Sequence, residues 1–176
     1  MPTFEQSNLI LGLATLGIQI AALLLLLVFF FRNNAEVAPL SFFLKRIGLP
    51  LGLILTLGAI LITLYHSVIL GIIPCSLCYV QRIFLYPQAI LFIVALWKKD
   101  HSVADYSIAL SLFGGGVALY QHLLQMGAVS TAPCTVGGAD CAARIFFEFE
   151  YITYPLMAFS LFAFLIVLML FMRRST

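Results

Sequence analysis

Charged residues are scarce in this sequence: only 9% of its 176 residues are Asp, Glu, Lys or Arg, and 63% are hydrophobic. Soluble domains average about 25% charged residues. Proteins that bind nucleic acids also need many Lys and Arg residues to neutralise phosphates. A soluble fold of this length must leave much of its surface in water, so it cannot hide this many apolar side chains. The composition excludes those classes and a nucleic-acid partner. It predicts a small protein embedded in membrane lipid.

Long polar stretches are also missing, because apolar runs occupy most of the chain. A helix needs about 20 mostly apolar residues to cross a bilayer, and the runs that qualify lie near residues 9–31, 47–73, 75–97, 106–129 and 151–172. They lack the alternation of outer-membrane β-strands. No Lys or Arg precedes the first run, so we interpret it as a retained helix and not as a signal peptide. The sequence predicts an all-α membrane protein with five transmembrane helices.

The few basic residues are distributed unevenly between the two ends of these helices. Seven of the nine lie on one side of the predicted membrane: Arg32, Lys45, Arg46, Lys98, Lys99, Arg173 and Arg174. The other side has only Arg82 and Arg144. Because basic loops stay in the cytoplasm, we expect the N-terminus outside and the C-terminus in the cytoplasm.

Cysteine is rare as well, and all four cysteines fall at the predicted outer ends of the helices. Cys75 and Cys78 form C-S-L-C where the second run turns into the third, and Cys134 and Cys141 lie in the loop between the fourth and fifth. Thiols outside the cytoplasm meet an oxidising environment, which favours disulfides over a zinc site, so we predict no metal. Three pairings are possible. Local spacing favours Cys75–Cys78 together with Cys134–Cys141.

The C-x-x-C pair has the features of a redox-active dithiol. Its ring is too small to stabilise a fold strongly. Pro74 favours a new helix, which puts Cys78 in the first turn near the positive end of the helix dipole, and Arg82 follows one turn later on the same face. We infer that Cys78 is the reactive thiolate and Arg82 its cation. An inert disulfide and an arginine that extends to the lipid headgroups are the simpler interpretation.

The loop pair allows two interpretations. Gly137 and Gly138 permit a tight reversal between Cys134 and Cys141, so this disulfide can be a static clip. A second dithiol beside a C-x-x-C is also what a relay needs, in which one disulfide meets an outside partner and passes electrons to the other. The residues alone leave both interpretations open.

The sequence lacks nucleotide, haem and flavin motifs, so a quinone, either ubiquinone or menaquinone, is the natural electron acceptor. Arg82 can stabilise negative charge on a quinone oxygen. His122 belongs to a polar cluster with Gln121 and Gln125 at the outer end of the fourth run, and it can hydrogen-bond or protonate the quinone. A packed histidine is the alternative. His66, near the end of the second run, is a weaker candidate for the same pocket.

These motifs together resemble those of a known family. The stretch I-P-C-S-L-C-Y-V-Q-R-I-F-L-Y-P, the Pro-Cys…Cys loop and the following Y-I-T-Y-P-L are similar to DsbB-type disulfide bond formation proteins, most closely the BdbC-like branch. The resemblance covers about residues 47–172. It implies a four-helix redox core over residues 47–176, preceded over residues 1–46 by an extra transmembrane helix and a cytoplasmic loop.

The resemblance also implies an activity and a role for each cysteine. It implies a quinone-dependent oxidase of the bacterial cytoplasmic membrane that re-oxidises a DsbA-like thioredoxin-fold protein. By this analogy Cys134 forms the mixed disulfide with the partner, and Cys141 then exchanges with Cys75. Cys78 reacts with the quinone, with assistance from Arg82.

Three features depart from the family pattern. The first helix is additional, the loop between Cys134 and Cys141 is shorter than in enterobacterial members, and Gln81 stands where some members carry an acidic residue. The runner-up is an enzyme similar to vitamin K epoxide reductase, in which the loop cysteines usually precede the C-x-x-C. A small non-enzymatic membrane subunit with structural disulfides is the third interpretation.

Overall fold

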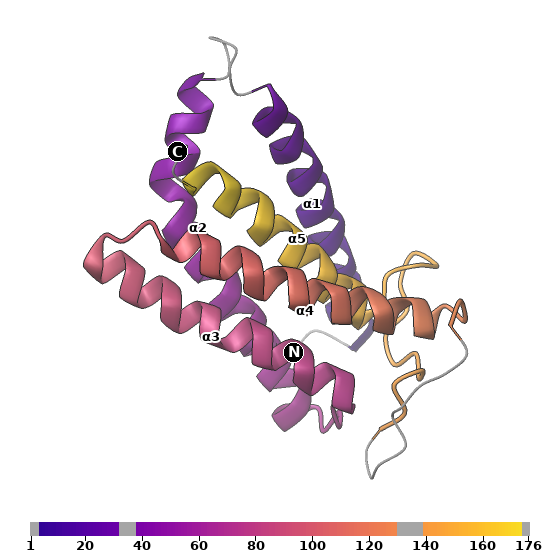
Figure 1. Ribbon diagram of the computed structural model, residues 1–176. Helices are drawn as coiled ribbons and strands as arrows, with labels where there is room; N and C mark the ends of the chain where they lie inside the picture. Colours follow the sequence, from indigo (N-terminus) through magenta and orange to yellow (C-terminus); the bar gives the residue numbers. More distant parts are fainter. Residues whose placement is uncertain (1–3, 32–37, 130–138, 174–176) are drawn as a thin grey trace.

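The computed structural model describes residues 4–31, 38–129 and 139–173, and helices account for most of them (Figure 1). In chain order the long helices are α1 (Phe4–Phe30), α2 (Ala38–Leu64), α3 (Ser76–Lys98), α4 (Val103–Gln125) and α5 (Tyr154–Met172). All five are long and apolar enough to cross a membrane. The described residues form no strand, and the predicted all-α membrane fold is confirmed.

α5 lies at the centre of the bundle and organises the other helices around it. It packs against α4, α1 and α2, and it is the most deeply buried of the five, whereas α1 is the least. Gly114 brings α4 close to α5, because a Cβ atom there would lie 2.5 Å from the Phe162 ring. α3 completes the bundle by packing against α4 and α2. This packing holds the ends of α3 and α4, which carry the site, beside each other.

The second helix begins earlier than the hydropathy predicts. It starts at Ala38, and not near residue 47, so Lys45 and Arg46 are exposed side chains of α2 instead of loop residues. Both residues are good helix formers, and Pro39 lies in the first turn, where proline is well tolerated. The backbone therefore stays helical beyond the stretch that is apolar enough to be recognised as a span.

The second span also ends earlier than predicted, and it ends in a π-helical turn. α2 gives way to η1 (Tyr65–Ile69), and the chain then leaves helical geometry, with Gly71 at a φ of 65°. The Ser67 hydroxyl donates to the carbonyl oxygen of Thr63 over 2.8 Å, which fastens this turn to the helix above it. Turns of this kind are frequent at functional sites.

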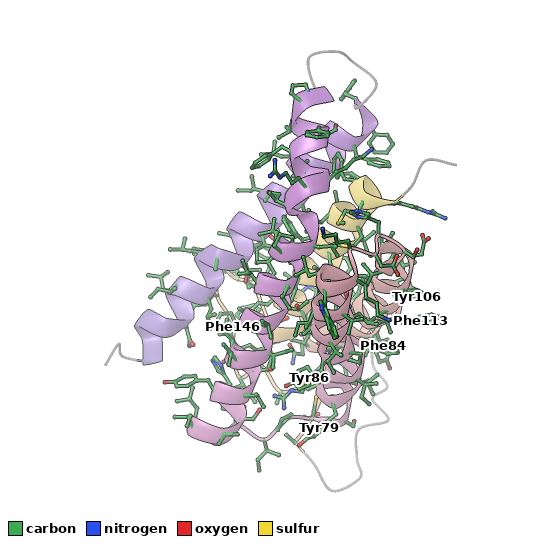
Figure 2. All side chains as sticks on the ribbon, turned by 90° about the vertical axis from the view of Figure 1, so that its left-hand side faces the viewer. Tyr79, Phe84, Tyr86, Tyr106, Phe113 and Phe146 are labelled. Carbon is green, nitrogen blue, oxygen red and sulfur yellow. The ribbon has the colours of Figure 1, made fainter. Side chains whose placement is uncertain are left out.

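The two ends of the bundle differ in chemistry. Arg173 forms an ion pair with Asp105 over 2.9 Å, which joins the end of α5 to the start of α4, close to Lys98 at the end of α3. The C-x-x-C pair lies at the other end of α3. Figure 2 shows this separation, with Tyr79 near the cysteine end and Tyr106 toward the opposite end.

Candidate active site

Cys75 and Cys78 form the start of α3, as the sequence predicts. Cys75 is the N-cap residue, with extended backbone geometry, and its sulfur accepts a hydrogen bond from the backbone N–H of Cys78 over 3.4 Å. Both are free thiols, and their sulfur atoms lie 2.9 Å apart. A disulfide needs a separation of about 2.05 Å. The pair is therefore placed to open and close by a movement of less than an ångström.

The two thiols have different surroundings. Cys75 is only 4% exposed, whereas Cys78 is partly exposed. The hydrogen bond to the Cys78 sulfur, together with burial, raises the pKa of the Cys75 thiol well above its usual range. Cys75 therefore holds its proton, and Cys78 is the more accessible sulfur of the pair.

The side-chain amide of Gln121 contacts both sulfur atoms. It is 1% exposed and reaches across from α4, and its Nε2 lies 3.0 Å from the Cys75 sulfur and 3.5 Å from the Cys78 sulfur. The Gln121 oxygen in turn accepts a hydrogen bond of 2.6 Å from Nε2 of Gln81. A buried amide donor pointing at both sulfurs stabilises negative charge on either one.

The contact of Gln121 with both sulfurs was not predicted from the sequence. The polar cluster at the end of α4 was the available signal, but the expected role fell on its neighbour His122. In the structure, Nδ1 of His122 instead hydrogen-bonds the Thr153 hydroxyl over 2.9 Å, and Thr153 caps α5. His122 is not among the residues that line the cavity next to the cysteines. The expected histidine thus joins α4 to α5, and the adjacent glutamine contacts the sulfurs.

Arg82 lies in the same cavity as Cys78 but makes its hydrogen bonds elsewhere. Its Nη2 donates to the carbonyl oxygen of Thr63 over 3.0 Å and to the Ser67 hydroxyl. Its guanidinium carbon lies 5.7 Å from the centre of the Tyr79 ring. Within the described residues, no hydrogen bond joins Arg82 to Cys78. The arginine therefore binds the π-helical turn while its charge remains in the cavity.

Cys141 lies beside Cys75 although the two are far apart in sequence. Cys141 is fully buried and disulfide-bonded, and it belongs to the same small cluster as Cys75 and Leu124. The Ser76 hydroxyl lies 3.7 Å from the Cys141 sulfur. The predicted partner, Cys134, lies outside the described residues. The fold thus brings one loop cysteine to the buried member of the C-x-x-C pair.

Side chains of α4 hold the segment that carries Cys141. Nε2 of Gln125 donates to the carbonyl oxygens of Ala143, over 3.0 Å, and Cys141, over 3.4 Å. Arg144 donates back to the carbonyl oxygen of Gln125. These contacts fix Cys141 relative to the helix end that also presents Gln121.

A cavity of about 480 Å³ opens beside the cysteines. Cys78, Arg82 and Gln121 line its polar end, and most of its remaining wall is apolar. This volume lies within the range of roughly 300–1,000 Å³ that is usual for small-molecule sites. His66, the weaker histidine candidate, lines this cavity, and its ring meets the Tyr154 ring edge-on at 5.3 Å.

Comparison with known proteins decides the family. The model of the family described as disulfide bond formation protein DsbB matches residues 45–172. The chain belongs to the DsbB family. Its members are membrane oxidoreductases of disulfide bond formation, which favours this interpretation over one based on vitamin K epoxide reductase. The match starts after α1, so the extra helix lies outside the residues that carry the DsbB signature.

Individual relatives agree with this assignment. The chain is 36% identical over 106 residues to "Probable disulfide formation protein C 1" of Bacillus anthracis, which covers 60% of this chain and 73% of that protein. It is 33% identical over 147 residues to "Probable disulfide formation protein" of Metapseudomonas resinovorans, which covers 81% of this chain and 98% of the relative. "Probable disulfide formation protein C" of Halalkalibacterium halodurans is 34% identical over 130 residues, covering 73% and 95%. No solved structure matches the chain.

Proposed function

We propose that this DsbB-family chain re-oxidises a thioredoxin-fold dithiol protein outside the cytoplasm and passes the electrons to a membrane quinone. The observation that supports this best is the position of Cys75, which lies 2.9 Å from the Cys78 sulfur and packs in one buried cluster with Cys141. A relay needs a cysteine of one pair that lies within reach of a cysteine of the other pair, so that the two can exchange disulfides. Cys75 is such a residue, and Cys78 beside it faces the cavity.

The relay proceeds by thiol–disulfide exchange. A thiolate of the reduced partner attacks Cys134 and breaks the Cys134–Cys141 bond, so that Cys141 leaves as a thiolate. The second partner thiol then displaces Cys134 and closes the partner's own disulfide. Cys141 attacks Cys75 and breaks the Cys75–Cys78 bond, which releases Cys78 as a thiolate. Cys134 attacks Cys141, restores the loop disulfide and leaves Cys75 reduced. Two electrons have then moved from the partner to the C-x-x-C pair.

The residues around the cavity fit a quinone. A bound quinone supplies a two-electron, two-proton acceptor for the reduced C-x-x-C pair. The apolar wall suits its tail, and Arg82 places a cation in the cavity. Two buried polar atoms of residues lining the cavity, Oε1 of Gln125 and the Tyr154 hydroxyl oxygen, have no hydrogen-bond partner among the described residues. They are available to a polar ring, and Cys78 is the sulfur that delivers electrons into this space.

We further propose that the cysteine end of the bundle faces away from the cytoplasm of a bacterial cell. Lys98 ends α3, and Arg173 and Asp105 pair at this same end of the bundle, away from the cysteines. Cytoplasmic loops carry the excess of Lys and Arg. This orientation places Cys75 and Cys141 where a secreted partner can be served, and it keeps the dithiols out of the reducing cytoplasm.

Quinone reduction by the purified protein tests this function. With long-tailed ubiquinone and a reduced thioredoxin-fold dithiol protein, the wild-type chain should reduce the quinone, followed by its ultraviolet absorbance. Cys78→Ser should abolish turnover, because the C-x-x-C disulfide can no longer form. Trp97→Phe, at the far end of α3, is the matched control and should retain the wild-type rate. Full activity of a Cys75→Ser/Cys78→Ser double variant would refute the proposal.

A trapping experiment tests the partner side of the relay. A thioredoxin-fold partner that lacks its second thiol should attack Cys134 of the wild-type chain and release Cys141 as a thiolate. The mixed disulfide should then persist, because the second partner thiol is the group that displaces Cys134. The complex should contain a thioredoxin-fold protein and should dissociate on reduction. If Cys134 captures no thioredoxin-fold protein, the loop pair is a static clip and the proposed relay is wrong.

A further inference from the structure

One wall of the cavity comes from the helix that the family match does not include. Leu11, Ala14, Thr15 and Ile18 of α1 line the cavity. Their spacing of three, four and seven residues puts them on one face of the helix. From Leu11 to Ile18 this face extends for about 10 Å along the axis. The extra helix therefore contributes a continuous strip to the site and not a single contact.

α1 is held in this position by specific contacts with α5 and the loop before it. Nε2 of Gln19 donates to the Ser160 hydroxyl over 2.9 Å, and the Tyr151 hydroxyl donates to the Gln19 oxygen over 3.2 Å. A Cβ atom at Gly12 would lie 3.1 Å from the Phe149 ring, so glycine permits a close approach there. These contacts set the rotation of α1 and direct the strip toward the cavity.

The walls beside this strip are aliphatic. They come from α2, through Ile54, Gly58 and Ile62, and from α5, through Ala158 and Leu161. Figure 1 shows α1 and α2 on either side of α5, and both helices pack on it. The cavity is therefore continuous from a polar end, at the cysteines, to an aliphatic part bounded by α1, α2 and α5.

We propose that α1 forms one wall of a subsite for the polyprenyl tail of the quinone and thereby raises the affinity for long-tailed quinones over tail-less ones. The inference rests on the proposed function, because it assigns the tail of the same acceptor whose ring lies near Cys78. With the quinone ring at the polar end, its tail extends along the aliphatic part of the cavity. The strip on α1 forms one side of that part, and α2 and α5 form the others. The shared chemistry of the subsite is a long hydrocarbon chain, and the test below separates a quinone tail from a phospholipid acyl chain.

Filling the strip should impair the tail subsite selectively. Ala14→Phe puts a large side chain on the cavity face, and Gly17→Phe puts the same ring on the same helix, at a position with no neighbouring atom within 4 Å. We expect Ala14→Phe to raise the ratio of apparent KM for long-tailed ubiquinone to that for a tail-less benzoquinone by about tenfold. Gly17→Phe should leave that ratio at the wild-type value.

Several outcomes would overturn the inference. An unchanged KM ratio in Ala14→Phe, or an equal change in Gly17→Phe, would mean that α1 does not discriminate tails. If thermal unfolding shows that Ala14→Phe is not folded, Ile18→Ala is the substitute. It should raise the KM ratio by about threefold, because the shorter side chain loses contact with the tail. A phospholipid that co-purifies with the wild type and is not displaced by long-tailed ubiquinone would assign the strip to lipid. If the wild type reduces neither quinone, the proposed function itself fails.

Discussion

The side-chain amide of Gln121, near the end of α4, lies 3.0 Å from the sulfur of Cys75, the N-cap residue of α3. The same amide lies 3.5 Å from the Cys78 sulfur, and Gln81 orients it from behind. The side chain that contacts both sulfurs is thus a neutral hydrogen-bond donor. It stabilises a thiolate without the cost of burying a second charge at the membrane boundary.

Removing this donor should slow the chemistry more than it harms the fold. We expect Gln121→Leu to lower kcat for quinone reduction by about tenfold to a hundredfold, because a thiolate forming on either sulfur loses its buried N–H donor. Gln88→Leu is the matched control, since Gln88 is also fully buried and hydrogen-bonded, but to Ser107 and Ser111. That control should lose stability and keep its kcat per folded molecule. A wild-type kcat in Gln121→Leu would contradict the assignment.

The hydrogen bond between Arg82 and Ser67 allows two contributions of the arginine to be tested separately: its positive charge and the position of its guanidinium group. Ser67→Ala removes one partner of the guanidinium and keeps the cation in the cavity. We expect it to raise the apparent KM for quinone by about threefold, and Arg82→Leu to raise it by about tenfold or more. Steady-state kinetics at saturating partner protein measures both. Equal effects of the two variants would mean that position alone matters, and no effect of either would remove Arg82 from the site.

The raised pKa of Cys75 predicts a pH dependence of thiol modification. The hydrogen bond to Cys78 favours the protonated form of Cys75, so in the reduced protein Cys75 should resist iodoacetamide well above the usual thiol pKa of about 8.5. In Cys78→Ala the largest cause of the shift is gone, and alkylation of Cys75 should begin at lower pH. Tandem mass spectrometry across a pH series reads out the site. Identical profiles in the two proteins would exclude this coupling.

The contact between His122 and Thr153 predicts a structural role for this histidine. His122→Ala removes a hydrogen bond to the cap of α5 and should lower the free energy of unfolding by about 1 kcal/mol. We expect its apparent KM for quinone to stay at the wild-type value, because His122 is not among the residues that line the cavity. Thermal unfolding in detergent and quinone kinetics on the same sample measure both. A large rise in KM with unchanged stability would restore His122 as a quinone ligand.

The placement of the C-x-x-C pair could be predicted from sequence because it depends on local chemistry. Pro74 and Gly71 stop the second helix, and a cysteine at the N-cap follows directly from the new start. The five spans are likewise a matter of length and hydropathy. The start of α2 was wrong by about nine residues, since Lys45 and Arg46 lower the hydropathy without breaking the helix.

The choice between Gln121 and His122 could not be made in the same way. Neighbouring residues on a helix point about 100° apart, so a polar cluster at a helix end does not reveal which member faces α3. That direction depends on how α4 is rotated against α3 and α5, and the close approach of Gly114 to Phe162 is one of the contacts that constrain this rotation. The partner of Arg82 was hidden for a similar reason, because the π-helical turn that carries Ser67 has no clear sequence signal.

The sequence by itself determined a five-helix membrane protein with two cysteine pairs, because bilayer thickness and the start of a helix act on consecutive residues. Only the tertiary structure placed Cys141 beside Cys75, turned Gln121 toward their sulfurs and put the face of α1 around Ala14 on the cavity. These are contacts between segments distant in the chain. They depend on how helices rotate and pack around α5, which no local pattern of residues specifies.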